Sequence, residues 1–414
     1  MDSGHTAWML MASALVFFMT PGLAFFYGGL VRAKNLVNTV MLSIMTICVV
    51  TIVWTLWGYS LAYGPNVTGA PLIEGVIGNF EVLGLNGIRW DPLDSGGSFG
   101  GSGVDVLFQM MFAIITPALI TGAFVERFKF STYLIFTVIW ITLVYCPVAY
   151  WVWGGGWIGA DGAGALDFAG GIVIHITAGA AAVAAALLVG KRSNPGLQPN
   201  NVPYVILGAA ILWFGWFGFN GGSALLADGY AVNAMLVTQI SAATAATTWG
   251  LIGLFKTGKI SGIGIATGAI AGLASITPAA GSVNALGALA IGLGAGIICY
   301  FAVELIKKTN LDDALDVFAV HGVGGLWGCI AAGIFAVESI AGVKGLIDGS
   351  FDQVWIQTYT ALAVLVYTFV VSFIILFILD KVPGLGLRVS ASDEDLGLDL
   401  AAHGEQATVR DGAD

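Results

Sequence analysis

The chain has 414 residues, of which 57% are hydrophobic and 10% charged, and its mean hydropathy is +0.90. A soluble domain carries roughly 25% charged residues, because its whole surface must be wetted. The composition therefore excludes an ordinary soluble fold and predicts a polytopic membrane protein, whose outside is solvated by lipid. The formal charge of −10 belongs to loops and the tail, so it gives no reason to expect a nucleic-acid partner.

Windows of about 20 apolar residues, enough to cross the hydrocarbon core, predict an all-α protein with eleven transmembrane helices. In chain order they lie near residues 6–31, 36–63, 104–125, 131–153, 169–190, 203–225, 232–255, 260–277, 283–306, 317–337 and 354–379. The first window has no basic leader and no obvious cleavage site, so we expect a retained span rather than a signal peptide.

The basic residues test this count and give it a direction. All of the 15 Lys and Arg residues except Arg89 and Lys344 fall in alternate loops or after the last window. Because basic loops stay on the cytoplasmic side, we expect a plasma-membrane protein with its N-terminus outside and its C-terminus in the cytoplasm.

Three segments stand outside the windows. Residues 64–103 are rich in Gly, Asp and Pro and predict an ordered outer cap over a vestibule, and residues 153–167 predict a second outer turn. The acidic tail, judged from its own residues, predicts a solvated and disordered end. We therefore divide the chain into a transmembrane domain, residues 1–380, and a cytoplasmic tail, residues 381–414.

The cysteines indicate packing rather than chemistry. Cys48, Cys146, Cys299 and Cys329 lie in or beside apolar runs, and their spacing matches no zinc or redox motif. We expect all four to be buried and reduced. No phosphate-binding, dinucleotide-binding or nucleophile motif occurs, so the sequence does not predict an enzyme.

Two histidines lie inside predicted helices, His175 in GGIVIHITAG and His321 in DVFAVHGVGG. An ionisable residue within a span is costly and is by default a functional candidate, although a single one can also be a packing residue. His175 follows Asp167 by eight residues, about 12 Å along a helix entering from outside. His321 follows Asp316 by five, about 7.5 Å along a helix entering from the cytoplasm, so we expect the imidazoles to meet near the midplane.

This placement suits two inverted five-helix halves plus a final helix around a central hydrophobic pore. An odd number of spans in each half inverts the second half relative to the first, and this parity carries the argument because no strong internal repeat is visible. Two neutral imidazoles can donate, accept and share a proton, which suits a small N–H donor. A metal site is the alternative, but it needs three or four ligands and the windows offer no further His.

Aromatic residues recur at helical spacing. Phe108 and Phe112 are four residues apart, and Trp216, Phe219 and Ser223 follow at intervals of three and four. These residues alone favour packing or an interfacial belt, although aromatic faces beside a hydroxyl also suit a cation.

Two further residues mark the outer ends of predicted helices. Trp153 ends one window at the outer interface, and Asp167 precedes another. Asp167 is more typical of a helix N-cap than of a direct ligand, although a carboxylate near an outer mouth also favours cations.

Taken together, these segments match one known family. The chain resembles an ammonium transporter of the Amt/Mep/Rh superfamily, in the microbial Amt branch, over nearly its whole length. The matching segments stand in the same order: TPGLAFFYGGLVRAKN (20–35), GAFVERFKFS (122–131), DFAGGIVIHI (167–176), WFGFNGGSA (216–224), DVFAVHGVGG (316–325) and GLRV (386–389).

The resemblance implies a role for each matched residue at the outer mouth. It implies that Trp153, Phe112 and Ser223 recruit ammonium by cation–π contact and a hydroxyl. Phe108 would lie beside this site, and Asp167 would support it structurally.

Further into the pore, the resemblance implies a gate formed by stacked Phe112 and Phe219. His175 and His321 would then line the pore as a hydrogen-bonded pair, with Trp216 in its wall.

The resemblance also implies partners. They are ammonium or ammonia, with methylammonium as a related substrate, two further copies in a homotrimer with one pore each, and a PII-type signalling protein at the cytoplasmic face. It implies no cofactor and an ordered first part of the tail, against the prediction from the tail's own residues. The sequence leaves open whether a proton follows by a separate, electrogenic route. An ammonium sensor, a metal-dependent membrane enzyme and a carbon dioxide channel in the Rh manner remain as alternatives.

Overall fold

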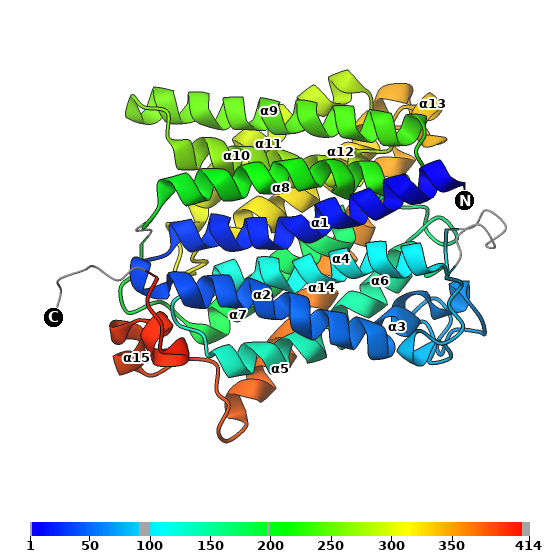
Figure 1. Cartoon of the computed structure of the whole chain (residues 1–414). Coiled ribbons are helices and arrows are strands. Elements are labelled where there is room, and N and C mark those ends of the chain that lie inside the picture. Colours follow the sequence, from blue (N-terminus) through cyan, green and yellow to red (C-terminus); the bar gives the residue numbers. More distant parts are fainter. Residues whose placement is uncertain (1, 91–98, 197–198, 408–414) are drawn as a thin grey trace.

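The computed structural model describes residues 2–90, 99–196 and 199–407, and in this part of the chain long helices run side by side as one bundle (Figure 1). No β-strand occurs among these residues. The all-helical class predicted from composition is therefore confirmed, since helices satisfy every backbone hydrogen bond within lipid.

Several spans of the first half are built from consecutive helical segments. They are α1 Ser3–Leu30, α2 Leu36–Val53 continued by η2 Trp54–Gly58 and α3 Tyr59–Tyr63, α4 Gly103–Ile120, α5 Phe130–Trp140 continued by η6 Ile141–Tyr145 and α6 Cys146–Trp153, and η7 Gly171–Ile176 with α7 Thr177–Val189. Here η2, η6 and η7 are π-helical turns within otherwise continuous spans.

The second half repeats five long helices and adds one. They are α8 Val202–Gly222, α9 Gly229–Thr257, α10 Gly262–Ile276, α11 Ala285–Ile306, the π-helical η9 Phe318–Gly322 with α12 Val323–Phe335, and the final α14 Asp352–Lys381. The short α13 Glu338–Ala341 lies before α14, and α15 Ala391–Leu396 and η11 Asp399–His403 follow it.

Ten of these helical segments are long and apolar enough to cross a membrane, and each lies at one of the predicted windows. The eleventh predicted helix is α9, which has 29 residues but a lower hydropathy because it carries several Ser, Thr and Gln side chains. Its Thr238 and Thr244 hydroxyls donate to carbonyl oxygens four residues earlier in the same helix. These polar groups are therefore satisfied inside α9, which packs against α10 and α11 and brings the count to eleven.

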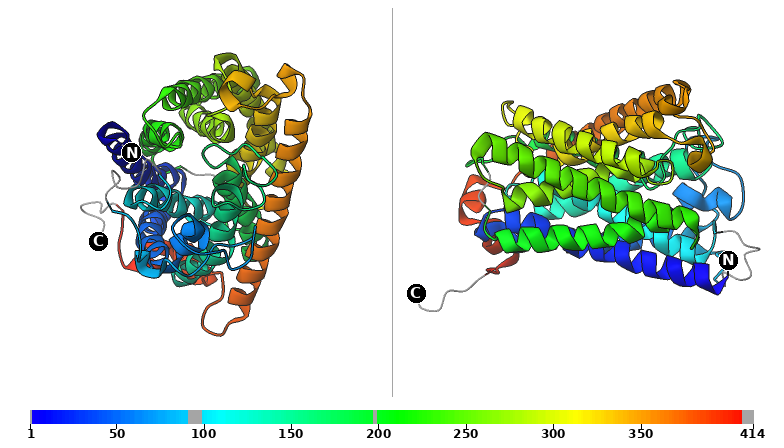
Figure 2. Two further views of the ribbon diagram at one scale, coloured as in Figure 1. Left: turned by 90° about the vertical axis from the view of Figure 1, so that its right-hand side faces the viewer. Right: turned by 90° about the horizontal axis from the view of Figure 1, so that it is seen from above.

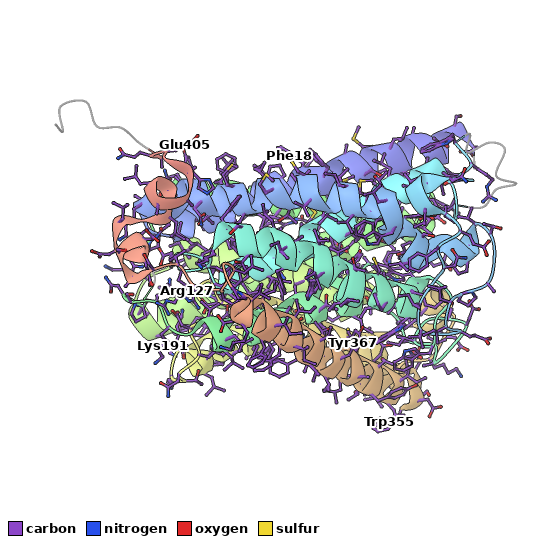
Figure 3. The ribbon with its side chains drawn as sticks, turned by 90° about the horizontal axis from the view of Figure 1, so that it is seen from below. Phe18, Arg127, Lys191, Trp355, Tyr367 and Glu405 are labelled. Carbon is purple, nitrogen blue, oxygen red and sulfur yellow. The ribbon has the colours of Figure 1, made fainter. Side chains whose placement is uncertain are left out.

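The two ends of the bundle are distinct. α1 begins at the end that carries the cap between α3 and α4, whereas α15 lies at the opposite end (Figure 1). Arg127 and Lys191 lie at the same end as the tail residue Glu405, and Trp355 lies at the far end of α14 (Figure 3). α14 runs obliquely across one side of the bundle while most other helices are seen nearly end-on (Figure 2).

The two halves are inverted relative to each other. α7 begins after the outer turn at residues 153–167, whereas α12 begins after the loop that contacts Arg127 at the tail end. Each of these two helices opens with a π-helical turn that contains a histidine.

The outer cap is ordered where it is described. Asn79 is buried, and its side-chain amide donates to the carbonyl of Thr68 while the N–H of Gly78 donates to the carbonyl of Leu61. Residues 91–98 of the predicted cap lie outside the described residues. The described part encloses a cavity, as the prediction of a vestibule requires.

The tail folds back onto the end of the bundle. The N–H of Lys129 donates to the carbonyl of Leu387, and the N–H of Val389 donates to the carbonyl of Arg127. The Asp399 carboxylate accepts from the N–H of Asn38 at 2.8 Å. The disorder predicted from the acidic composition is therefore wrong for residues 382–407, because the tail backbone pairs with the loop at Arg127 and the first turn of α2 binds Asp399. Residues 408–414 lie outside the described part. The boundary at residue 381 remains a prediction.

The cysteine prediction is confirmed for three of the four residues. All four cysteines are free, and Cys146, Cys299 and Cys329 are buried. Cys48 is exposed on α2, so its predicted burial is wrong. A thiol is apolar enough to lie on a lipid-facing surface, which is why an apolar run alone does not separate buried from lipid-exposed positions.

Candidate functional site

Three cavities follow one another through the bundle. The outer one encloses about 310 Å³, the middle one about 10 Å³ and the inner one about 30 Å³. Phe112 lines the outer cavity, and Phe219, whose ring contacts that of Phe112, lines the middle one. Phe26 and His321 line both the middle and the inner cavity. The cavities therefore form one interrupted line from the outer cap toward the tail end.

The outer cavity brings together four of the residues predicted for recruitment, Phe108, Phe112, Trp153 and Ser223. The rings of Phe112 and Trp153 lie 6.1 Å apart and nearly perpendicular, at 83°. The Ser223 hydroxyl donates to the carbonyl of Phe219 at 2.8 Å, which leaves its oxygen free to accept from an N–H donor. A small cation in this cavity meets aromatic rings and a hydroxyl oxygen together.

A pair of phenylalanine rings, tilted by 41° rather than stacked as the resemblance implies, closes the floor of the outer cavity. The centroids of Phe112 and Phe219 lie 4.4 Å apart, and both side chains are buried. Below them the middle cavity offers about 10 Å³, which is at the lower limit for one water molecule. A hydrated ion does not fit there.

The two buried histidines meet in the middle cavity. The Nδ1 atoms of His175 and His321 lie 3.2 Å apart, and their ring planes are inclined by only 21°. One Nδ1 must therefore carry the proton and the other must accept it. With both rings neutral, one Nε2 is then an acceptor and the other a donor. Within the described part of the chain, the His175 Nε2 has no hydrogen-bond partner.

Close backbone packing and an aromatic wall hold this pair. A Cβ added to Gly179 on α7 would lie 2.3 Å from the Cα of Gly322 on η9, so only glycine permits the two histidine helices to approach this closely. On the other side, the ring of His175 stacks on Trp216 at 5.5 Å, and the Trp216 indole N–H donates to the hydroxyl of Thr277 at 2.9 Å.

Asp167 caps the first histidine helix. Its carboxylate oxygens accept from four successive backbone N–H groups, those of Gly170, Gly171, Ile172 and Val173, at 2.6 to 3.1 Å. Its carbonyl accepts from the indole N–H of Trp153 at 2.9 Å. Burial raises the pKa of this carboxyl to about 6, while the four N–H bonds oppose the rise and favour the ionised form. Asp167 thus orders both the helix and the wall of the outer cavity.

Asp313 plays the corresponding part in the second half, and sequence reasoning missed it. Its carboxylate accepts from the N–H groups of Val317 at 3.1 Å and Phe318 at 2.7 Å. Asp316, which precedes His321 by five residues, does not cap the helix in this way; it lines the inner cavity and forms an ion pair with Lys307 at 3.3 Å. The available signal was spacing, because His321 follows Asp313 by eight residues as His175 follows Asp167.

Largely buried ion pairs link the loops at the tail end of the bundle. The Glu126 carboxylate binds Arg32 at 2.6 Å and Arg192 at 3.0 Å, and Arg192 also binds Asp312 at 2.8 Å. Although burial opposes it, the hydrogen bonds and charge of Arg192 lower the pKa of the Asp312 carboxyl. The network ties the loops of both halves together beside the docked tail, whose Glu394 accepts from the N–H of Ser193 at 2.6 Å.

The described residues offer no group of three or more His, Cys, Asp and Glu side chains that could hold a metal ion. The histidine pair supplies two nitrogens, and its remaining neighbours in the middle cavity are apolar or aromatic. This donor set does not fit a metal site, which needs at least three ligands.

Comparison with known proteins points to one family. A model of the Ammonium Transporter Family matches residues 7–408. An ammonium transporter of Aquifex aeolicus is 48% identical over 410 residues, which cover 98% of this chain and 94% of the relative.

Solved structures give the same result. The crystal structure of Saccharomyces cerevisiae Mep2 matches with a TM-score of 0.86 at 36% identity, over 95% of this chain and 88% of the other. A sensor Amt protein matches with a TM-score of 0.86 at 29% identity, over 97% and 98% of the two chains.

Proposed function

The chain belongs to the ammonium transporter family, and from that premise we propose that it is an ammonium channel that carries ammonium nitrogen into the cytoplasm through the three cavities. Ammonium is held in the outer cavity by Trp153, Phe112 and Ser223. It transfers its proton to water in the outer cavity, above the Phe112–Phe219 gate, and ammonia passes the gate and the histidine pair to the inner cavity.

The observation that carries this proposal is the middle cavity. It is lined by apolar and aromatic residues, has room at most for one small molecule, and contains the linked imidazoles of His175 and His321. Ammonia is uncharged and no larger than water, and it can accept from one Nε2 and donate to the other. Potassium has no proton to give up, and the described lining of the middle cavity offers apolar and aromatic side chains rather than a ring of carbonyl oxygens to replace its water, so it is excluded.

Replacing both histidines by alanine tests the proposal. We expect the widened, imidazole-free cavity in the His175→Ala/His321→Ala variant to lose selectivity for ammonium over potassium in proteoliposomes. His403→Ala is the matched control, since this histidine lies in the tail, where it bonds to Asn38. Unchanged selectivity in the double variant contradicts the proposed pore.

We further propose the plasma membrane as the location, with the cap end outside and the tail end in the cytoplasm. The support is the clustering of basic residues in the loops at the tail end. Labelling a single cysteine introduced in the cap and one in the tail from outside intact cells tests this orientation.

A homotrimer and a PII-type partner complete the proposal. Large apolar side chains, such as Val232 on α9 and Leu286 on α11, are exposed on the bundle and suit either lipid or a neighbouring copy. The docked tail offers an ordered cytoplasmic surface to a signalling protein. Native mass spectrometry of the solubilised protein, with and without a PII protein, tests both assemblies.

A sensor is the second candidate function. A sensor Amt protein shares the fold along nearly the whole chain, and the tail of this chain is placed where movements of the bundle could reach it. Ammonium-induced currents in a reconstituted bilayer distinguish the candidates, since a sensor conducts little. The same currents separate electrogenic from neutral transport.

A further inference from the structure

The wall of the outer cavity depends on a loop with no regular structure of its own. Leu166 and Asp167 lie between the outer turn and η7, in backbone that is neither helix nor strand. The N–H and carbonyl of Leu166 are partly buried and need hydrogen-bond partners. They find both in one side chain from the far end of the sequence.

That side chain is Gln357, near the outer end of α14, and it is fully buried. Its Oε1 accepts from the N–H of Leu166 at 2.6 Å, and its Nε2 donates to the carbonyl of Leu166 at 2.7 Å. The amide thus pairs with both backbone groups of one residue, as a neighbouring β-strand would.

The remaining capacity of the Gln357 amide is also used. Nε2 donates to the carbonyl of Cys329 on α12 at 3.2 Å, and Oε1 accepts from the Nε2 of Gln353 at 3.2 Å. Gln353 in turn donates to the carbonyl of Gly164 at 3.0 Å. Because Cys329 lies two helical turns beyond His321, the one amide joins the loop of the first half, the histidine helix of the second half and the final helix.

The next peptide along the chain is the one that orients the indole of Trp153. The carbonyl of Asp167 follows Leu166 directly and accepts from the Trp153 Nε1 at 2.9 Å. With its N–H committed to that carbonyl, the indole stays nearly perpendicular to the ring of Phe112 and lines the outer cavity.

We propose that Gln357 is a positioning residue for cation recruitment, which acts by clamping the backbone of Leu166 and thereby fixing the plane of the Trp153 indole. Gln357 does not line the outer cavity and touches no transported species. The inference rests on the proposed recruitment role of Trp153.

The chemistry of the clamp is specific to an amide. Glutamate at position 357 keeps the acceptor but loses both donors, and it sets a carboxylate against the carbonyls of Leu166 and Cys329. Methionine has a similar length and loses every hydrogen bond. Both substitutions leave the cavity lining unchanged in composition.

Ammonium uptake by proteoliposomes of the full chain tests the proposal through a double-mutant cycle. We expect Gln357→Met to raise the KM about fivefold or more with a smaller change in maximal rate, because a misplaced ring loses cation–π attraction. In a Trp153→Leu background the same substitution should leave the KM unchanged, since the group it positions is gone. Thr360→Val is the control: it removes another buried polar group of α14 whose hydroxyl bonds only to its own helix.

The outcomes separate the two levels of inference. A Trp153→Leu variant with an unaltered KM overturns the recruitment site itself. The positioning role alone is overturned if Trp153→Leu alters the KM but Gln357→Met has no effect. It is likewise overturned if Gln357→Met changes the KM equally with and without Trp153. If Gln357→Met does not assemble, Gln353→Met carries the test, because it removes only the supporting bonds; it should raise the KM less, and again only when Trp153 is present.

Discussion

The four hydrogen bonds to the Asp167 carboxylate allow its replacement by asparagine to be predicted in detail. An asparagine keeps one oxygen, which can still accept from two of the four N–H groups. Its NH₂ group faces the other two, so two donors are left unpaired in a buried site. A hydrogen bond to a charged group is worth about 1.5–3 kcal/mol, so Asp167→Asn should cost about 3–6 kcal/mol of local stability.

Such a loss is visible in two measurements. The thermal unfolding temperature of the solubilised protein should fall by roughly 5 °C or more, since about 1 kcal/mol corresponds to a few degrees in a domain of moderate size. Ammonium uptake should fall as well, because the start of η7 carries His175 only eight residues after the cap. The matched control is Asp161→Asn, which removes an exposed carboxylate from the same loop. An unfolding temperature for Asp167→Asn within a degree of that control would refute the reasoning.

Three shorter predictions concern the helix contacts and the tail end. Gly179→Ala should abolish uptake, because the new Cβ forces the histidine helices apart at a cost of about 1–3 kcal/mol of overpacking. Gly253→Ala, with no atom closer than 3.7 Å to the new Cβ, should leave uptake unchanged. Equal uptake by both variants contradicts the packing role of Gly179. Glu126→Gln should destabilise the tail end of the bundle by about 3 kcal/mol, because it leaves the buried Arg192 and the partly buried Arg32 short of a carboxylate. An unaltered denaturation midpoint argues against it. Although burial raises the pKa of Glu394, a backbone N–H and an arginine together hold it below its ordinary value of 4.5. The contribution of Glu394 to tail docking is therefore complete above pH 4.5 and is lost as the pH falls through the lowered pKa. Pepsin should then cleave the tail progressively faster, and a cleavage rate that does not depend on pH would exclude this role of Glu394.

The membrane-spanning architecture was predictable because it depends on a local property. A window of apolar residues crosses lipid wherever it sits in the fold, so the windows at 36–63 and 131–153 match continuous spans even though each is interrupted by a π-helical turn. Those turns were not predictable, since no residue type marks a π-helical turn within an apolar window.

The site was predictable only in part, because many of its contacts join residues that are far apart in the sequence. His175 and His321 were identified because an ionisable residue in a span is conspicuous, and the parity of the helices brought them together. Asp313, whose carboxylate caps the second histidine helix, was not identified, because Asp316 is the acid nearer to His321 in the sequence. Gln357 left no signal at all, since its partner lies 191 residues away in sequence and only the fold joins them.

The carboxylates of Asp167 and Asp313, which cap the two histidine helices, also bear on the electrostatics of the two pore ends, and their surroundings differ. The free N–H groups at the start of a helix carry about half a positive charge, which by itself repels a cation. The carboxylate of Asp167 accepts from these N–H groups and opposes that repulsion, as the proposed recruitment of ammonium requires. At the inner end, burial and the neighbouring Asp316 raise the pKa of Asp313 to about 7, and two N–H groups oppose the rise. Four N–H groups oppose it at Asp167, whose pKa is raised to about 6. We therefore expect the cap at the outer cavity to favour a cation more than the cap at the inner end, in keeping with the recruitment proposed for the outer cavity.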